Sequence, residues 1–246
     1  MTIERAVVVL DDARLPEAVD VGVLSRESRG AAEVVRFSYS EAWLNARNAF
    51  PLDPELPLFS GDQFPGDKRS MFGILRDTSP DRWGRVLMER REALEARGEK
   101  RKARRLGEWA FLLGVSDATR MSALRLRERG GEQRFLDHRL LGVPPEVRLR
   151  ELEAITRALD EPGSEERPEY ENWLRQLLAP GSSLGGARPK ATFSASDGTL
   201  WIAKFPARED RFDVGSWEFL AHQLAHRAGI RVPDARQLKL AGEHHT

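Results

Sequence analysis

The chain has 246 residues, 40% of them hydrophobic, which is enough for one or two domains with a buried core. Lysine and arginine together number 39, as do aspartate and glutamate, so the overall charge favours neither a nucleic acid nor a membrane as partner. The absence of cysteine excludes a disulfide framework and a thiol nucleophile, and it fits a cytoplasmic protein. No apolar run reaches the roughly 18 residues of a membrane span, and the N-terminus lacks a secretory pattern, so we expect no membrane contact.

The first hundred residues predict a small mixed subdomain. Three valine-rich segments separated by polar turns predict a strand meander over residues 6–10, 19–24 and 33–39. A short helix follows, and prolines at positions 51, 54, 57 and 65 then indicate an irregular crossing segment. Apolar residues at helical spacing, beginning with Trp83 and Val86, predict a helix whose N-cap is Ser79 or Asp81.

The end of that predicted helix is basic. Residues 97–105 contain six basic side chains and one acidic one. Such a run can contact DNA phosphates, or it can be a solvated helix end at which cations are favoured by the helix dipole. Glutamates alternate with the basic residues along the same helix, which favours the second interpretation and leaves the first open.

The middle of the chain predicts supporting elements. A short helix is expected over residues 109–115 and a strand over residues 122–126. Two further helices are expected over residues 145–159 and 168–178, because prolines open both and a Glu-Pro-Gly-Ser turn separates them. We assign these helices an architectural role.

The most informative stretch begins with a loop of small residues, from Gly181 to Pro189. Glycine has no Cβ, so the backbone N–H groups of such a loop can approach a phosphate chain closely. Two predicted strands follow, joined by a polar turn at Asp197 and Gly198. The second strand contains Lys204 among apolar neighbours, and a charged side chain in a strand built for burial needs a partner. The candidates are an anionic ligand held by the loop, or Glu218 on the next predicted helix.

That helix follows Asp213 and has an apolar stripe at helical spacing, formed by Trp217, Leu220, Ala221, Leu224 and Ala228. Glu218 lies at the edge of the stripe, where it is either a plain surface carboxylate or the partner of the strand lysine. His222 and His226 are four residues apart and could bind a metal together with Glu218. Both histidines lie away from the stripe and a further ligand is missing, so a solvated face is the favoured interpretation and no metal site is predicted.

Two other motifs in the loop are disfavoured. Residues 181–185 match the G-x-S-x-G pattern of a hydrolase nucleophile, but that serine needs a strand-to-helix turn, and here a helix precedes the loop and a strand follows it. The loop also fails the phosphate-loop pattern of nucleotide triphosphatases, because Lys190 is followed by Ala191 instead of serine or threonine.

Several segments match one known family, and they end with residues 183–191, Trp201 to Pro206, Trp217-Glu218 and residues 228–233. Further matching segments lie upstream, at residues 37–44, 50–52, 56–58 and 80–85. In these segments the chain resembles the HipA family of serine/threonine kinase toxins, and the upstream segments are similar to the N-terminal subdomain that precedes the kinase lobes of that family. The matched segments follow the family order from about Val7 to Pro233.

This resemblance implies a protein kinase that transfers the γ-phosphoryl of ATP, with Mg²⁺, to a protein serine. It implies that Lys204 and Glu218 are catalytic, with Lys204 on the phosphates and Glu218 orienting it. It implies that ATP is bound by Ser183, Gly185, Gly186, Ala187, Arg188, Lys190 and Lys204, and that Ser183 is an autophosphorylation site. It also implies a HipB-like DNA-binding antitoxin as partner, operator DNA through that complex, and a connection with bacterial persistence.

A kinase of this family also needs a second lobe with a catalytic-loop aspartate and a metal-binding aspartate. The last predicted element, residues 237–240, is one strand without a return strand, so we expect a truncated chain that lacks the second lobe and is inactive alone.

The sequence therefore predicts an α+β protein: a HipA-like subdomain over residues 1–106, followed by a protein-kinase-like N-lobe over residues 107–246, with an antiparallel sheet and helices. The predicted function is the nucleotide-binding part of a kinase toxin. The alternative is a non-catalytic module that binds an antitoxin or a DNA complex.

Overall fold

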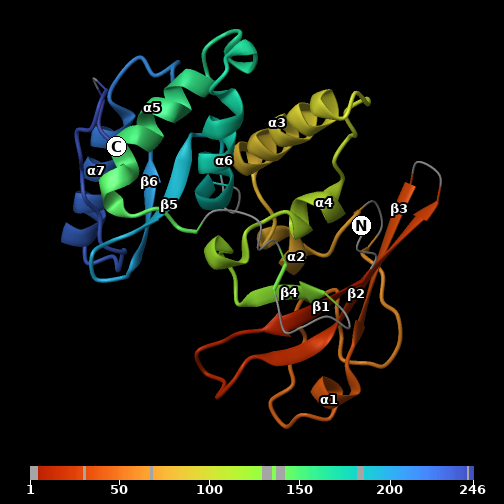
Figure 1. The fold of residues 1–246 in the computed structure, drawn as a ribbon. Helices are drawn as coiled ribbons and strands as arrows, with labels where there is room; N and C mark the ends of the chain where they lie inside the picture. The colour runs from red at the N-terminus through yellow and green to blue at the C-terminus, as the bar shows by residue number, and fades with distance from the viewer. Residues whose placement is uncertain are drawn as a thin grey trace. The chain divides into compact units, whose positions relative to one another are not determined.

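The computed structural model describes residues 5–29, 32–66, 69–128, 135–136, 142–181, 186–242 and 244–246. These residues form an α+β fold with antiparallel sheets, as the sequence predicts. The chain divides into two compact units (Figure 1): the first contains Met1–Pro80 and Glu95–Leu140, and the second contains Asp81–Leu94 and Leu141–Thr246.

The first unit is built on a four-stranded antiparallel sheet. The predicted meander is confirmed as β1 (Arg5–Leu10), β2 (Val19–Arg29) and β3 (Ala32–Tyr39). The predicted later strand is β4 (Leu124–Glu128), which pairs with the free edge of β1 and gives the strand order β3-β2-β1-β4. Because β4 belongs to this sheet, the first unit extends beyond residue 106, where the sequence suggested a boundary.

Short helices and the proline segment pack on this sheet, and their buried apolar side chains form one core together with those of the strands. The helices are α1 (Glu41–Leu44), α2 (Gly73–Asp77) and α4 (Glu108–Leu113), followed by a 3₁₀ turn at Asp117–Thr119. The Tyr39 hydroxyl ties the proline segment to the sheet, because it donates to the Leu56 carbonyl at 2.7 Å and accepts the Leu52 N–H at 2.9 Å.

A buried arginine, Arg120, forms hydrogen bonds with backbone carbonyls at the ends of two helices of the first unit. The guanidinium of Arg120 donates to the carbonyls of Thr78 (3.0 Å), Leu112 (3.0 Å) and Val115 (3.2 Å). These carbonyls lie at or after the ends of α2 and α4, where helices leave backbone acceptors without partners. The buried cation therefore satisfies three acceptors that the ends of these two helices would otherwise leave unpaired.

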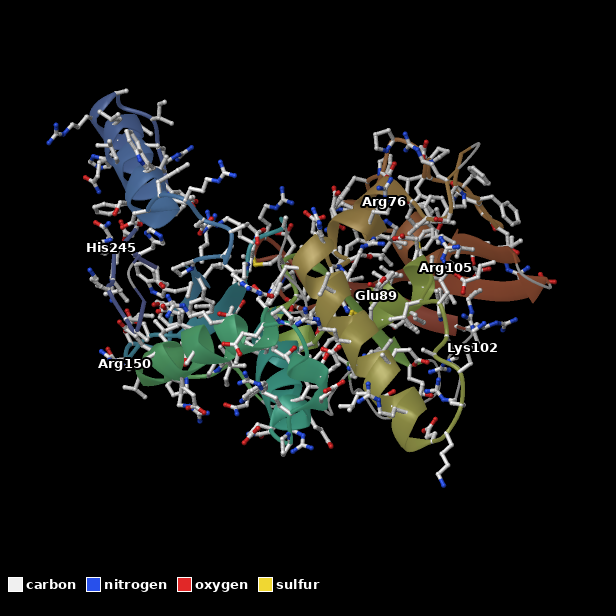
Figure 2. All side chains as sticks on the ribbon, turned by 90° about the horizontal axis from the view of Figure 1, so that it is seen from above. Arg76, Glu89, Lys102, Arg105, Arg150 and His245 are labelled. Carbon is white, nitrogen blue, oxygen red and sulfur yellow. The ribbon has the colours of Figure 1, made fainter. Side chains whose placement is uncertain are left out.

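The predicted helix after Pro80 is α3 (Arg82–Gly98), which ends earlier than the basic run. Lys100 has a φ of 53°, and the Arg101 N–H reaches back to the Ala96 carbonyl at 2.9 Å, a pattern that terminates helices. Most of the basic run is therefore outside the helix, which corrects the prediction of a basic helical tail. Figure 2 shows two of its exposed side chains, Lys102 and Arg105, on the segment that follows α3.

In the second unit, one helix packs against a two-stranded sheet and a second helix packs on the first. A 3₁₀ turn (Glu146–Arg148) leads into α5 (Leu149–Leu159), and another (Ser164–Glu166) precedes α6 (Tyr170–Gly181), in agreement with the two predicted helices. The sheet consists of β5 (Lys190–Ser194) and β6 (Leu200–Lys204), followed by α7 (Val214–Arg227). α6 packs on both β5 and α5 (Figure 1), so the apolar faces of these three elements form the core of this unit.

The end of the chain differs from its prediction. Residues 237–240 are not part of a strand. Leu238 instead exchanges two backbone hydrogen bonds with Thr246, at 3.0 and 2.9 Å, so the last residues turn back toward this segment. Among the described residues, no helix has both the length and the apolar character needed to cross a membrane.

Candidate functional site

The candidate site centres on two lysines that face each other across the small sheet. In the antiparallel register of β5 and β6, Lys190 lies directly opposite Lys204. Side chains opposite each other on an antiparallel pair point to the same face and lie close together. The sheet therefore places two positively charged side chains close together, which favours an anion at this end of the sheet.

Lys190 is the buried member of the pair, with 8% of its surface exposed. Burial lowers the pKa of its ammonium group, and the positive charge of Lys204 lowers that pKa further, while the charge of Asp81 opposes both effects. The region around Lys190 is thus electropositive and partly shielded from water.

Lys204 is exposed and forms an ion pair with Glu218 of α7. Half of the Lys204 side chain is exposed (50%), which differs from the expectation of a strand built for burial on both faces. The reason is the strand alternation: Leu200 and Ile202 share the open face with Lys204, whereas Ala203 faces the core. The structure therefore brings Lys204 and Glu218 together, the second of the two arrangements that the sequence left open.

α7 presents its apolar stripe to solvent, although a stripe at this spacing normally faces a core. Asp213 is its N-cap, accepting the Ser216 N–H at 3.0 Å, but Trp217, Leu220 and Leu224 are exposed. The helix instead turns its Phe219 and His222 side toward the rest of the unit, and the His222 ring pairs with the Pro233 carbonyl at 2.5 Å. His222 is half-buried and His226 is exposed, so only His226 lies on the fully solvated face that the sequence predicts for both. Among the described residues, no three histidine, aspartate or glutamate side chains gather into a metal site.

The end of the glycine loop is held by the first turn of α3. Gly186 has a φ of +84°, a conformation that favours glycine. Its N–H donates to Asp81 Oδ2 at 2.5 Å, and its carbonyl accepts the Trp83 N–H at 3.1 Å. The Trp83 indole N–H also donates to the Lys190 carbonyl at 3.0 Å. Of the residues predicted to bind ATP, Gly186, Ala187, Arg188, Lys190 and Lys204 are described, whereas Ser183 and Gly185 lie outside the described residues.

Arg188, another of the residues predicted to bind ATP, forms two hydrogen bonds with the carboxylate of Asp210, one of them at 2.6 Å. Burial opposes ionisation of Asp210, but the hydrogen bonds from Arg188 and from the Ala207 N–H, together with the positive charge of Arg188, outweigh it and lower the pKa of the Asp210 carboxyl. The Ala207 N–H donates to the same carboxylate at 2.8 Å, so Asp210 ties the loop after β6 to the glycine loop.

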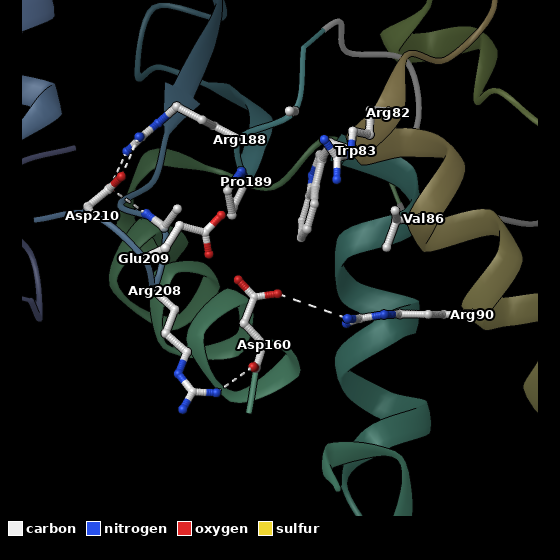
Figure 3. A pocket seen from close by; sticks show the side chains of 12 residues that line it. Arg82, Trp83, Val86, Arg90, Asp160, Arg188, Pro189, Arg208, Glu209 and Asp210 are labelled. Carbon is white, nitrogen blue, oxygen red and sulfur yellow. Dashed lines mark hydrogen bonds and ion pairs between the residues drawn. The ribbon is translucent and has the colours of Figure 1, made fainter. Parts of the chain in front are cut away.

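A pocket of about 720 Å³ lies on this side of the loop (Figure 3). Its walls come from the start of α3, the end of α5, and residues 187–189 and 207–210. Arg90 donates to the Leu159 carbonyl at 2.9 Å and Arg208 to the Asp160 carbonyl at 3.2 Å. Burial raises the pKa of the Asp160 carboxyl, and the charge of Glu209 contributes in the same direction. Most charges around this pocket are thus engaged with one another or with backbone carbonyls.

Sequence reasoning missed Asp81, Trp83 and Asp210 as partners of the glycine loop. Asp81 and Trp83 belong to a segment that predicts the start of a helix and resembles the family's N-terminal subdomain, and neither pattern indicates a contact with Gly186, more than a hundred positions later. Helical spacing predicts the helix but carries no information on which distant loop its first turn will contact. Asp210 follows a strand in a charged segment, and nothing in its neighbours distinguishes it from Glu209.

Two protein-family models match the chain. The model of the HipA N-terminal domain matches residues 15–111, and the model of the HipA-like C-terminal domain matches residues 182–246, so together they span more than half of the sequence. The second match contains the glycine loop, both lysines and Glu218. A comparison with curated proteins finds no significant match.

Proposed function

Because the chain belongs to the HipA family, a family of toxin–antitoxin systems, we propose that its second unit binds the phosphates of ATP as part of a serine/threonine protein kinase toxin. The observation that carries this proposal is the pair of cross-strand lysines beside the glycine loop, with Lys204 held by a helix glutamate. A glycine-rich loop, a strand lysine and a helix glutamate are the parts with which protein kinases hold ATP.

The residues of the site fit a phosphate group. A Cβ added at Gly186 would lie 2.7 Å from the Lys190 ammonium nitrogen, so the absence of a side chain at this position lets the loop lie close to that cation. Burial lowers the pKa of Lys190, the nearby charge of Lys204 lowers it further, and a phosphate beside the two ammonium groups would favour their charged forms. Lys190 and Lys204 would hold the phosphates, and Glu218 would keep Lys204 extended along the open face of β6.

ATP would supply the γ-phosphoryl group for transfer to a protein serine. The residues described here bind and orient that nucleotide. Among them no carboxylate cluster fits Mg²⁺, and we assign no step to the ion. A HipB-like DNA-binding antitoxin, and operator DNA through it, are the proposed partners, and autophosphorylation of Ser183 remains part of this proposal.

Calorimetric titration of the 246-residue chain with Mg-ATP tests the proposal. We expect saturable binding that weakens at least about tenfold in Lys204→Ala, the effect of losing one charged hydrogen bond. Lys239→Ala is the matched control, because Lys239 is also exposed and lies in the same unit, and it should bind like the parent. The Lys204–Glu218 pair is exposed, so its loss should change the free energy of unfolding by less than about 1 kcal/mol, and weaker binding would not reflect unfolding. Absence of binding in the parent, or equal binding in Lys204→Ala, would contradict the proposal.

The alternative function, a non-catalytic module that binds an antitoxin or a DNA complex, is favoured by one observation. Trp217, Leu220 and Leu224 expose 62%, 46% and 55% of their surfaces along one stripe of α7. Exposed apolar stripes of this kind are typical of protein-binding surfaces. Under this alternative, Trp217→Ser would abolish antitoxin binding, and the parent would not bind Mg-ATP.

A further inference from the structure

The first turn of α3 makes three hydrogen bonds to the described end of the glycine loop. Asp81 Oδ2 accepts the Gly186 N–H at 2.5 Å, the Trp83 N–H donates to the Gly186 carbonyl at 3.1 Å, and the Trp83 indole N–H donates to the Lys190 carbonyl at 3.0 Å. These contacts engage both backbone groups of Gly186 and the carbonyl of the residue that carries the buried ammonium group. The α3 turn therefore determines where the loop end and the first residue of β5 lie.

The rigidity of this turn comes from its own packing. The Trp83 side chain is buried, with 4% of its surface exposed, and Leu87, one helical turn later, is fully buried. A Cβ added at Gly181 would lie 2.9 Å from a Leu87 methyl carbon and 3.2 Å from the Trp83 indole nitrogen, so the end of α6 also packs closely against the same turn. A loop anchored to a packed helix loses less conformational entropy when it binds a ligand than a free loop does.

Asp81 also acts through its charge. The hydrogen bond from the Gly186 N–H, followed by that from the Arg82 N–H, holds the pKa of the Asp81 carboxyl below its ordinary value. Its negative charge raises the pKa of Lys190, against the lowering caused by burial and by Lys204. The ionised carboxylate thus stabilises the charged form of the buried lysine, which is the form that attracts a phosphate.

We propose that Asp81 is a positioning residue of the phosphate site: it fixes Gly186 by a backbone hydrogen bond and keeps Lys190 charged. The proposal rests on the function proposed above and adds a residue that acts through the loop without touching the nucleotide. It makes the turn at residues 81–83 part of the site, although this turn lies far from the glycine loop in the sequence.

The test compares three variants of the full chain. Asp81→Ala removes both the hydrogen-bond acceptor and the charge, whereas Asp81→Asn removes the charge but keeps an oxygen that can accept the Gly186 N–H. Asp234→Ala is the matched control, since Asp234 is an exposed carboxylate of the same unit. The first measurement needs no nucleotide and follows hydrogen exchange of the Gly186 amide by NMR. We expect exchange to accelerate on the order of tenfold in Asp81→Ala, to be largely restored in Asp81→Asn, and to be unchanged in the control.

The second measurement is the calorimetric affinity for Mg-ATP. Asp81→Ala should bind about tenfold more weakly than the parent, and Asp81→Asn should recover part of the loss, because the hydrogen bond returns without the charge. Unchanged Gly186 exchange in Asp81→Ala would overturn the proposal. Tighter nucleotide binding in both Asp81 variants would also overturn it, since the carboxylate would then be occupying the phosphate position. If the parent does not bind Mg-ATP, the proposed function fails, while the exchange measurement still decides whether Asp81 fixes the loop.

Discussion

Replacing Arg120 by methionine should strongly destabilise the first unit. Methionine approximates the length of the aliphatic stem but cannot donate a hydrogen bond, so the carbonyls of Thr78, Leu112 and Val115 lose the donors that they have at 3.0, 3.0 and 3.2 Å. Hydrogen bonds to charged groups contribute about 1.5–3 kcal/mol each and are not fully additive. The cost of burying the guanidinium, which is only 9% exposed, is relieved in the variant and offsets part of the loss. We therefore expect the free energy of unfolding to fall by about 3–5 kcal/mol, a large part of the roughly 5–15 kcal/mol of an ordinary domain.

Urea denaturation followed by circular dichroism measures this loss. Arg47→Met is the matched control in the same unit, because Arg47 is exposed, and it should change the free energy of unfolding by no more than about 0.5 kcal/mol. Arg120→Lys should be intermediate, because an ammonium group keeps the charge but lacks the planar fork that reaches separate carbonyls. The reasoning is refuted if Arg120→Met and Arg47→Met unfold at the same urea concentration.

Three further changes have defined outcomes. Gly22→Ala should lower the free energy of unfolding by about 1–3 kcal/mol, measured by urea denaturation, because the added Cβ would lie 2.4 Å from both the Phe37 ring and the Ser38 carbonyl oxygen; a neutral effect would show that β2 can shift. Gly186→Ala should reduce Mg-ATP affinity in calorimetry and leave the urea midpoint nearly unchanged, because its φ of +84° and the 2.7 Å approach to Lys190 strain only the loop; full affinity would contradict this. Burial lowers the pKa of Lys190, so the unfolded chain binds more protons between that lowered pKa and the ordinary 10.5, and stability from this group should rise with pH across that window. Urea denaturation from about pH 8 upward should show this rise in the free energy of unfolding in the parent, and a smaller rise in Lys190→Met.

Local patterns in the sequence correctly predicted most of the elements. The valine-rich segments correspond to β1 to β3, and the helical spacing of Trp83 and Val86 corresponds to α3. The polar turn at Gly198 joins β5 to β6, as predicted. Residues that are close in sequence determine these features, because hydrophobic period and turn chemistry act within a few positions. The same local reasoning placed Lys204 on the second strand and Glu218 on the helix that follows it, and the structure shows the two side chains paired.

Tertiary structure decided how those elements combine. β4 completes the sheet of the first unit by pairing with β1, and α7 exposes Trp217, although its stripe predicted a buried face. Asp81 reaches Gly186 across more than a hundred positions. Each outcome depends on which distant surfaces meet, and apolar periodicity shows that a face can be buried without identifying the surface that buries it. The sequence of this protein therefore predicted most of its secondary structure and offered the lysine–glutamate pair as one of two alternatives, whereas the anchoring of its glycine loop depends on the tertiary contacts of residues 81–83 with Gly186 and Lys190.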